Sequence, residues 1–148
     1  MRRNLPRLAL LAHVVTATPL WADPPPVMGP MSQSPGIPMM PSEFSAYALG
    51  RTLSYAANGV IWGQEQYLAD NRVIWAFTGQ DCQHGQWYPH GNAVCFVYEG
   101  DAAPKCWNFY MGPRGLIAKL IGDSDSAPLS EVGSSNQTLE CQGPQVGV

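Results

Sequence analysis

The sequence predicts an all-β domain in which roughly seven or eight short antiparallel strands form a meander. Three observations carry this prediction: turn residues recur at intervals of about ten residues, apolar and polar side chains alternate between the turns, and all four cysteines lie in the second half of the chain. Strands joined by tight turns are antiparallel, and closing their sheet removes its unpaired edges. The economical form is therefore a small barrel or a strongly curved sheet, with a two-sheet sandwich as the alternative.

The first expected element is a short helix over residues 42–50. Pro41 precedes it, Ser42 can cap its first turn, and Gly50 can end it. Its apolar side chains share one face that is spaced to lie against a sheet: Phe44, Tyr47 and Ala48.

Strands are expected from residue 51 onward. Residues 51–57 and 60–68 flank Asn58-Gly59, which is the strongest short signal for a hairpin, and Gly63 can form a bulge in the second of these strands. After a turn at 70–71, the later strands are expected over residues 73–78, 86–88, 94–99, 105–111, 116–121 and 129–132, with a further turn at 90–92.

The four cysteines predict two disulfides, because an even number in a small exported domain is typical of such bridges. Three pairings are formally open. If Cys95 faces Cys106 across the hairpin of residues 94–111, the inward face carries Val94, Phe96, Trp107 and Phe109. This register favours Cys95–Cys106, and it leaves Cys82–Cys141 as the second bridge. A zinc site is the rival reading, but no C-x-x-C pair is present.

Residues 1–22 have the layout of a cleavable signal peptide. Three arginines open the segment, residues 8–15 are apolar apart from His13, and Leu20-Trp21-Ala22 ends it with a small residue. The apolar run is too short to span a bilayer. We therefore expect a periplasmic or secreted protein without a membrane span.

Residues 23–41 are expected to be a disordered linker that leads to a single domain over residues 42–148. The linker holds seven prolines in nineteen residues. Without residues 1–22 the chain keeps five of its eight basic residues and all eleven acids, a net charge of −6. So acidic a chain, without a basic cluster, is a poor nucleic-acid binder.

Two groups of residues are candidate metal ligands. The linker holds Met28, Met31, Met39 and Met40, whose thioethers suit copper(I). His84 and His90 are expected in loops near Cys82 and are the second candidate set. Turn chemistry at these histidines, and tolerance of methionine in a spacer, are the simpler explanations. We expect no resident cofactor.

No catalytic motif is present in the sequence. It lacks a Gly-x-Ser-x-Gly turn and a phosphate-binding glycine loop, and the two disulfides would use every thiol. The aromatic residues either fill the core or line a cavity for a small molecule. A hydrolase whose site only the fold assembles remains a third hypothesis.

Residues 50–110 resemble a group of small exported alphaproteobacterial proteins classed as a domain of unknown function. The motifs that carry the resemblance are Gly50-Arg51-Thr52-Leu53, Gly85-Gln86-Trp87-Tyr88, Cys95-Phe96-Val97-Tyr98 and Cys106-Trp107-Asn108-Phe109. The resemblance implies a lipocalin-like curved sheet and a periplasmic location, and it carries no known catalytic residues.

These observations favour a non-enzymatic periplasmic module that binds an unidentified protein or small molecule, as a monomer. One form of this hypothesis is an inhibitor of cell-wall hydrolases, by analogy of fold alone. The alternative is copper handling by the methionines of the linker or by His84 and His90.

Overall fold

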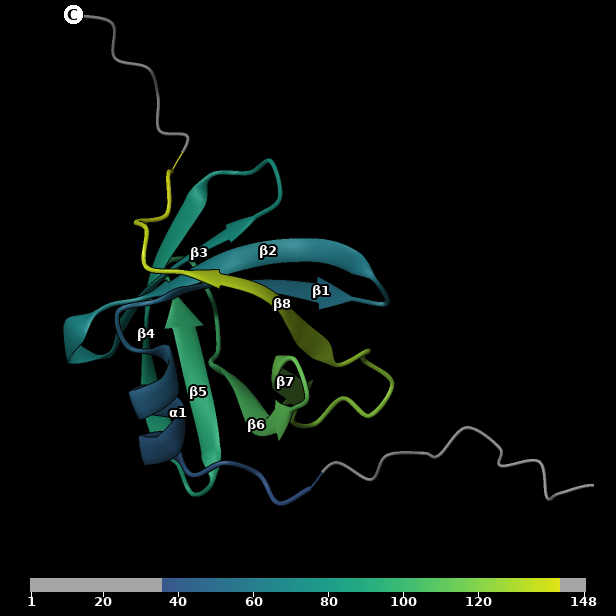
Figure 1. Ribbon diagram of the computed structural model, residues 1–148. Coiled ribbons are helices and arrows are strands. Elements are labelled where there is room, and N and C mark those ends of the chain that lie inside the picture. The colour runs from purple at the N-terminus through teal and green to yellow at the C-terminus, as the bar shows by residue number, and fades with distance from the viewer. Residues whose placement is uncertain (1–35, 142–148) are drawn as a thin grey trace, which may run out of the picture. The chain divides into compact units, whose positions relative to one another are not determined.

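A computed structural model describes residues 36–141 of the chain. Eight antiparallel strands, each hydrogen-bonded to its neighbours in sequence, close into a barrel when β8 pairs with β1 (Figure 1). The predicted barrel is therefore confirmed. The elements are α1 (Pro41–Ala48), β1 (Thr52–Ala57), β2 (Val60–Tyr67), the 3-10 turn η1 (Ala69–Asn71), β3 (Arg72–Phe77), β4 (Cys82–His90), β5 (Ala93–Tyr98), β6 (Lys105–Gly112), β7 (Gly115–Leu120) and β8 (Leu129–Ser135).

The β1–β2 hairpin follows from local turn chemistry. Asn58 and Gly59 both have positive φ, 50° and 80°, as the two-residue hairpin turn requires. The pairing shifts between Tyr55 and Ala56, so that Trp62 is an extra residue in β2. The predicted bulge thus lies beside Gly63, where a Cβ would stand 2.4 Å from the carbonyl oxygen of Ala76.

The helix α1 closes one end of the barrel. Phe44 is fully buried, and its ring packs on four inward-facing aromatic rings, those of Tyr67, Trp87, Phe96 and Phe109. Because successive strands run in opposite directions, the β1–β2, β3–β4, β5–β6 and β7–β8 connections all lie at the other end. In Figure 1, α1 is at the left of the barrel and the tip of the β1–β2 hairpin is at the right.

The start of α1 differs from the prediction. The helix begins at Pro41, with Met40 as the capping residue, and Ser42 lies exposed within its first turn. The Glu43 carboxylate accepts a hydrogen bond of 2.8 Å from the Met40 backbone N–H. Proline is favoured at the first helical position because it has no N–H to leave unpaired.

The barrel domain also begins before the predicted boundary at residue 42. The backbone N–H of Met39 donates a 2.7 Å hydrogen bond to the carbonyl oxygen of Phe109, and the Met39 side chain packs against the core. Residues 39–41, which the sequence placed in the linker, therefore belong to the folded domain. Residues 36–38 of the predicted linker lie outside helices and strands, and residues 23–35 lie outside the described residues.

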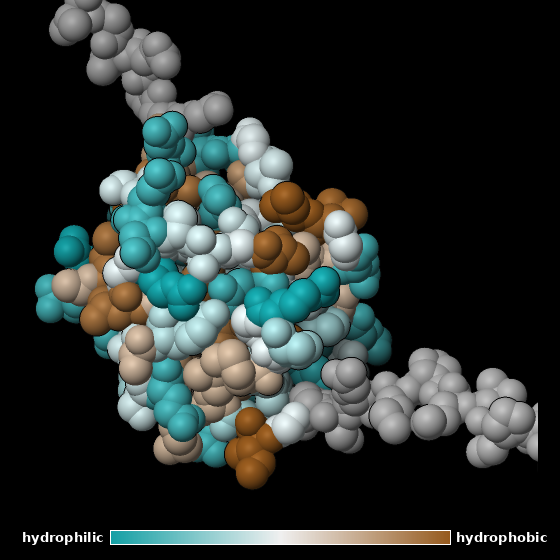
Figure 2. Space-filling model, viewed as in Figure 1, coloured by the Kyte–Doolittle hydropathy of each residue, from teal (hydrophilic) through white to brown (hydrophobic). Residues whose placement is uncertain are grey.

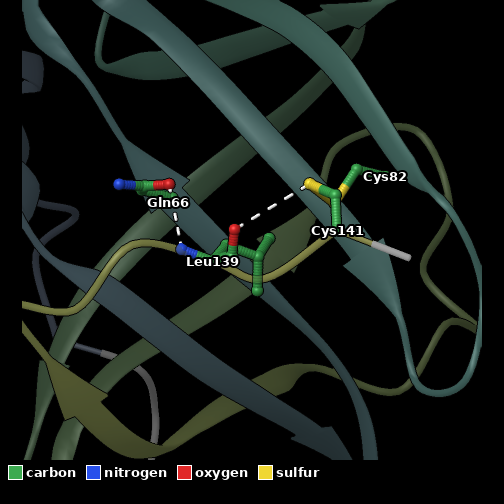
Figure 3. Close-up of a disulfide and its surroundings, with 4 residues drawn as sticks. All are labelled: Gln66, Cys82, Leu139 and Cys141. Carbon is green, nitrogen blue, oxygen red and sulfur yellow. Dashed lines mark hydrogen bonds between the residues drawn. A yellow bond between two sulfur atoms is a disulfide. The ribbon is translucent and has the colours of Figure 1, made fainter. Parts of the chain in front are cut away.

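Both predicted disulfides are present. Cys95 faces Cys106 in the predicted register, with Val94 opposite Trp107, and Cys82 is bonded to Cys141. The second bridge fastens the segment after β8, residues 136–141, which we call the strap. Along it, Thr52 Oγ1 donates to the carbonyl oxygen of Gln137, and the Leu139 N–H donates to Gln66 Oε1. Figure 3 shows the end of the strap.

The strand β4 is longer than expected. The sequence predicted residues 86–88, whereas β4 spans nine residues and pairs with both β3 and β5. Its polar residues and Gly85 interrupt the alternation of apolar and polar side chains that would indicate a strand in the sequence. His84 and His90 therefore lie on a strand, which corrects their predicted loop positions.

The apolar core lies inside the barrel. Its buried residues come from α1 and from all eight strands, with Leu53, Val73, Val94 and Leu116 among the most enclosed. On the face shown in Figure 2, most of the surface is teal or white, with brown side chains in small separate groups. Within residues 36–141, no helix has the length and apolar character needed to cross a membrane.

Candidate functional site

The barrel encloses a cavity of about 180 Å³ in its half away from α1. Nine aromatic side chains line it: Tyr55, Trp62, Tyr67, Trp75, Phe77, Phe96, Tyr98, Trp107 and Phe109. In an eight-stranded barrel, the inward side chains either fill the interior or leave room for one small ligand. The cavity is therefore the space where such a ligand would fit.

Strand alternation brings these side chains inward. In β3, Val73, Trp75 and Phe77 lie on one side of the strand. The rings of Trp75 and Phe77 pack edge to face, with 5.3 Å between their centroids. Trp62 reaches the same group from the bulge in β2, at 5.4 Å from Phe77. The bulge thus adds a tryptophan to the open end of the cavity.

A buried carboxyl group lies in the cavity wall. Glu65 in β2 is only 5% exposed, and it accepts hydrogen bonds from the hydroxyl groups of Tyr67, at 2.8 Å, and Tyr98. The Tyr55 and Tyr67 hydroxyl oxygens are 2.9 Å apart. Because the Tyr67 proton is directed to Glu65, Tyr55 is the donor in that bond. Three phenols therefore form a hydrogen-bonded network that ends on one carboxylate.

Burial controls the protonation of this network. It raises the pKa of Glu65 from 4.5 to about 7, although hydrogen bonds from Tyr98 and Tyr67 act in the opposite direction. Burial, followed by the nearby charge of Glu65, also raises the pKa of Tyr67 and Tyr98 well above the ordinary value for phenols. The phenols thus stay neutral donors at physiological pH, whereas Glu65 titrates near neutrality.

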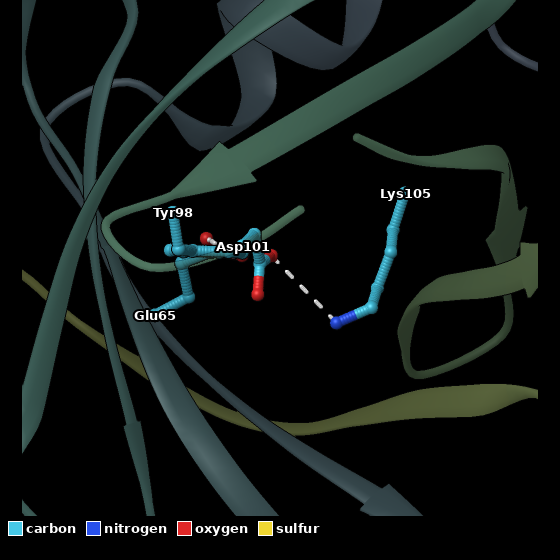
Figure 4. Close-up of polar contacts among 4 residues, drawn as sticks. All are labelled: Glu65, Tyr98, Asp101 and Lys105. Carbon is cyan, nitrogen blue, oxygen red and sulfur yellow. Dashed lines mark hydrogen bonds and ion pairs between the residues drawn. The ribbon is translucent and has the colours of Figure 1, made fainter. Parts of the chain in front are cut away.

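Two further charged residues line the cavity at its open end. Asp101 is in the β5–β6 loop, and Lys105 is the first residue of β6. Lys105 Nζ lies 3.7 Å from Asp101 Oδ2. Figure 4 shows Lys105 extending toward Asp101 on the side away from Glu65. The lysine is 59% exposed, so the pair stands at the entrance rather than in the interior.

A second buried carboxylate, Glu131 in β8, has a structural role. It accepts hydrogen bonds from the Tyr47 hydroxyl, at 2.8 Å to Oε2, and from the Leu116 backbone N–H, also at 2.8 Å. These bonds join α1 to β8 and β7. Glu131 is not among the cavity-lining residues.

The structure separates the predicted metal-ligand candidates. Met28 and Met31 lie outside the described residues. Met39 packs against the core, Met40 caps α1, and His84 and His90 are exposed on β4. Among residues 36–141, no three His, Cys, Asp or Glu side chains are grouped so that they could hold a metal ion.

Sequence reasoning did not identify Glu65. A signal was present, because Glu65 is two residues from Tyr67 and therefore shares its face of the strand. The predicted hairpin also paired this strand with the one that carries Tyr55. A glutamate on an aromatic, inward face is the pattern that could have marked the site.

Comparisons with known proteins do not extend this picture. No family model matches the chain, and no curated protein and no solved structure matches it. The resemblance to exported alphaproteobacterial proteins stays a prediction.

Proposed function

We propose that this protein is a non-enzymatic binding module that holds one small, largely apolar molecule inside its barrel. The observation that carries the proposal is the aromatic cavity of about 180 Å³ with a buried carboxyl group in its wall. An apolar cavity of about 150 Å³ is large enough to take up benzene. The ligand is thus about the size of one substituted ring.

The architecture supports binding within the barrel rather than on its outside. The helix α1 blocks one end through Phe44, and the opposite end is bordered by Trp62, Asp101 and Lys105. Ligand sites of this kind combine an apolar wall with a few polar groups that orient the ligand.

We further propose that the protein works in the periplasm or outside the cell. Two disulfides are consistent with an oxidising compartment. The signal-like segment over residues 1–22 predicts the same compartment. Fractionation of cells that express the full chain would test this, and a cytoplasmic form with reduced thiols would contradict it.

Binding can be tested by NMR titration of the full chain with benzyl alcohol. We expect the largest shifts at the indole N–H signals of Trp75 and Trp107. In a variant with a filled cavity, Ala118→Leu, binding should weaken, because Ala118 is 2% exposed and lines the cavity. The matched control is Ala69→Leu, the same change at an exposed position in η1.

The result against the proposal is equally specific. A circular dichroism spectrum first checks that both leucine variants keep the wild-type fold. If the two folded variants bind benzyl alcohol equally well, then the cavity is not its binding site.

A further inference from the structure

The charges that line the cavity do not balance. Glu65 and Asp101 each bring a carboxylate when ionised, whereas Lys105 brings the single ammonium group among the described lining residues. Lys105 is paired with Asp101 at the entrance. The interior carboxylate of Glu65 therefore has no cationic partner among residues 36–141, and its contacts are hydrogen bonds from Tyr67 and Tyr98.

Asp101 adds an acceptor without a donor. Its Oδ2 atom is buried, and no described residue makes a hydrogen bond to it. The 3.7 Å to Lys105 Nζ is an ion-pair distance, longer than a hydrogen bond between nitrogen and oxygen. A buried acceptor left unpaired costs free energy, which a donor on a ligand would recover.

The walls between these acceptors are suited to a cation. The faces of aromatic rings carry negative electrostatic potential, and tryptophan attracts cations most strongly. Three of the four tryptophans in the described residues, Trp62, Trp75 and Trp107, line the cavity. An ammonium group would thus meet carboxylate oxygens and aromatic faces, while an anion would meet both unfavourably.

We infer that the ligand is a small organic cation, a protonated amine whose ring-sized apolar body packs among the tryptophans while its ammonium group donates to Glu65 and Asp101. This inference rests on the proposed binding function and adds the charge of the ligand to it. The two tyrosine donors prepare the site, because they keep Glu65 oriented and favour its ionised form.

Three ligands of matched size test the charge. Benzylamine, benzyl alcohol and benzoate share one ring and one substituent carbon, and at neutral pH they are a cation, a neutral molecule and an anion. By isothermal titration calorimetry, we expect benzylamine to bind about tenfold or more tightly than benzyl alcohol, because hydrogen bonds to charged groups are the stronger class. Benzoate should bind most weakly.

The variant Glu65→Gln tests whether Glu65 accepts the ammonium group of the ligand. It keeps the size of the side chain and removes its charge, so the preference for benzylamine over benzyl alcohol should fall by about tenfold. The control Glu99→Gln makes the same change at an exposed position on the outside of the barrel and should retain the full preference.

The outcomes separate this inference from the function on which it rests. If benzyl alcohol binds in the cavity as tightly as benzylamine, or if Glu65→Gln keeps the wild-type preference, the cationic ligand is wrong while the binding module stands. If none of the three ligands binds wild-type protein, the proposed function fails together with the inference.

Discussion

The protonation of Glu65 makes a quantitative prediction about stability. The substitution Glu65→Gln replaces a buried carboxyl group by an amide of the same shape. In the folded chain the pKa of Glu65 is raised from 4.5 to about 7. At about 1.4 kcal/mol per pH unit, this shift corresponds to about 3 kcal/mol between the protonated and ionised forms.

The sign follows from proton linkage. Between the two pKa values, the folded state holds a proton that the unfolded state has released, so the free energy of unfolding falls as the pH rises through this window. The amide cannot ionise, and it can still accept from Tyr67 while donating to Tyr98. Between about pH 4 and about pH 8, the free energy of unfolding of the variant should therefore rise by about 3 kcal/mol relative to that of the wild type.

Urea denaturation of both proteins at the two pH values, with the disulfides intact, measures this difference. Other titrating groups are common to both chains and cancel in the comparison. Glu99→Gln, at an exposed position, should follow the wild-type curve. Parallel pH profiles for Glu65→Gln and the wild type would refute the reasoning, because they would mean that Glu65 does not carry a raised pKa.

The remaining predictions concern the framework around the site. Replacing Cys82 and Cys141 by serine should lower the free energy of unfolding by about 4 kcal/mol, and replacing Cys95 and Cys106 by serine should lower it by about 3 kcal/mol. The first loss is larger because the bridged residues are 59 positions apart in the first pair and 11 in the second. Urea denaturation should give this order, and the reverse order would contradict the loop-entropy account. Phe44→Ala should lower the free energy of unfolding by about 3 to 5 kcal/mol in the same assay. An effect no larger than that of a surface substitution would show that α1 does not close the barrel. Gly85→Ala should lower the melting temperature, since its Cβ would stand 2.6 Å from both the Tyr98 ring and the backbone carbonyl oxygen of Val97. An unchanged melting temperature would contradict this account.

Much of the barrel could be predicted because its determinants are local. Asn58-Gly59 dictates a tight hairpin whatever surrounds it, and the facing of Cys95 and Cys106 follows from alternation along two strands that one short loop joins. Such features need only a few neighbouring residues. They were sufficient to predict the meander, the inward aromatic face and the Cys95–Cys106 bridge, which left Cys82–Cys141 as the second.

The site was harder to predict because it depends on strands that meet only in three dimensions. Glu65 lies among Tyr55, Tyr67 and Tyr98, and the last of these is 33 positions away on a strand that is not a neighbour of β2 in the sheet. The strand β4 was underestimated for a related reason. Gln83 and Gly85 have little strand preference of their own, and hydrogen bonds to both neighbouring strands hold them extended.

The bridge that fastens the strap also changes the covalent topology of the chain. Cys82 opens β4, and Cys141 lies beyond β8, so the five strands from β4 to β8 belong to one covalent ring. A protease that cuts once within this ring cannot release a fragment, because both new ends remain attached through sulfur. A nicked molecule would keep all its strands, and with them the cavity that they surround, for as long as the disulfide stays oxidised.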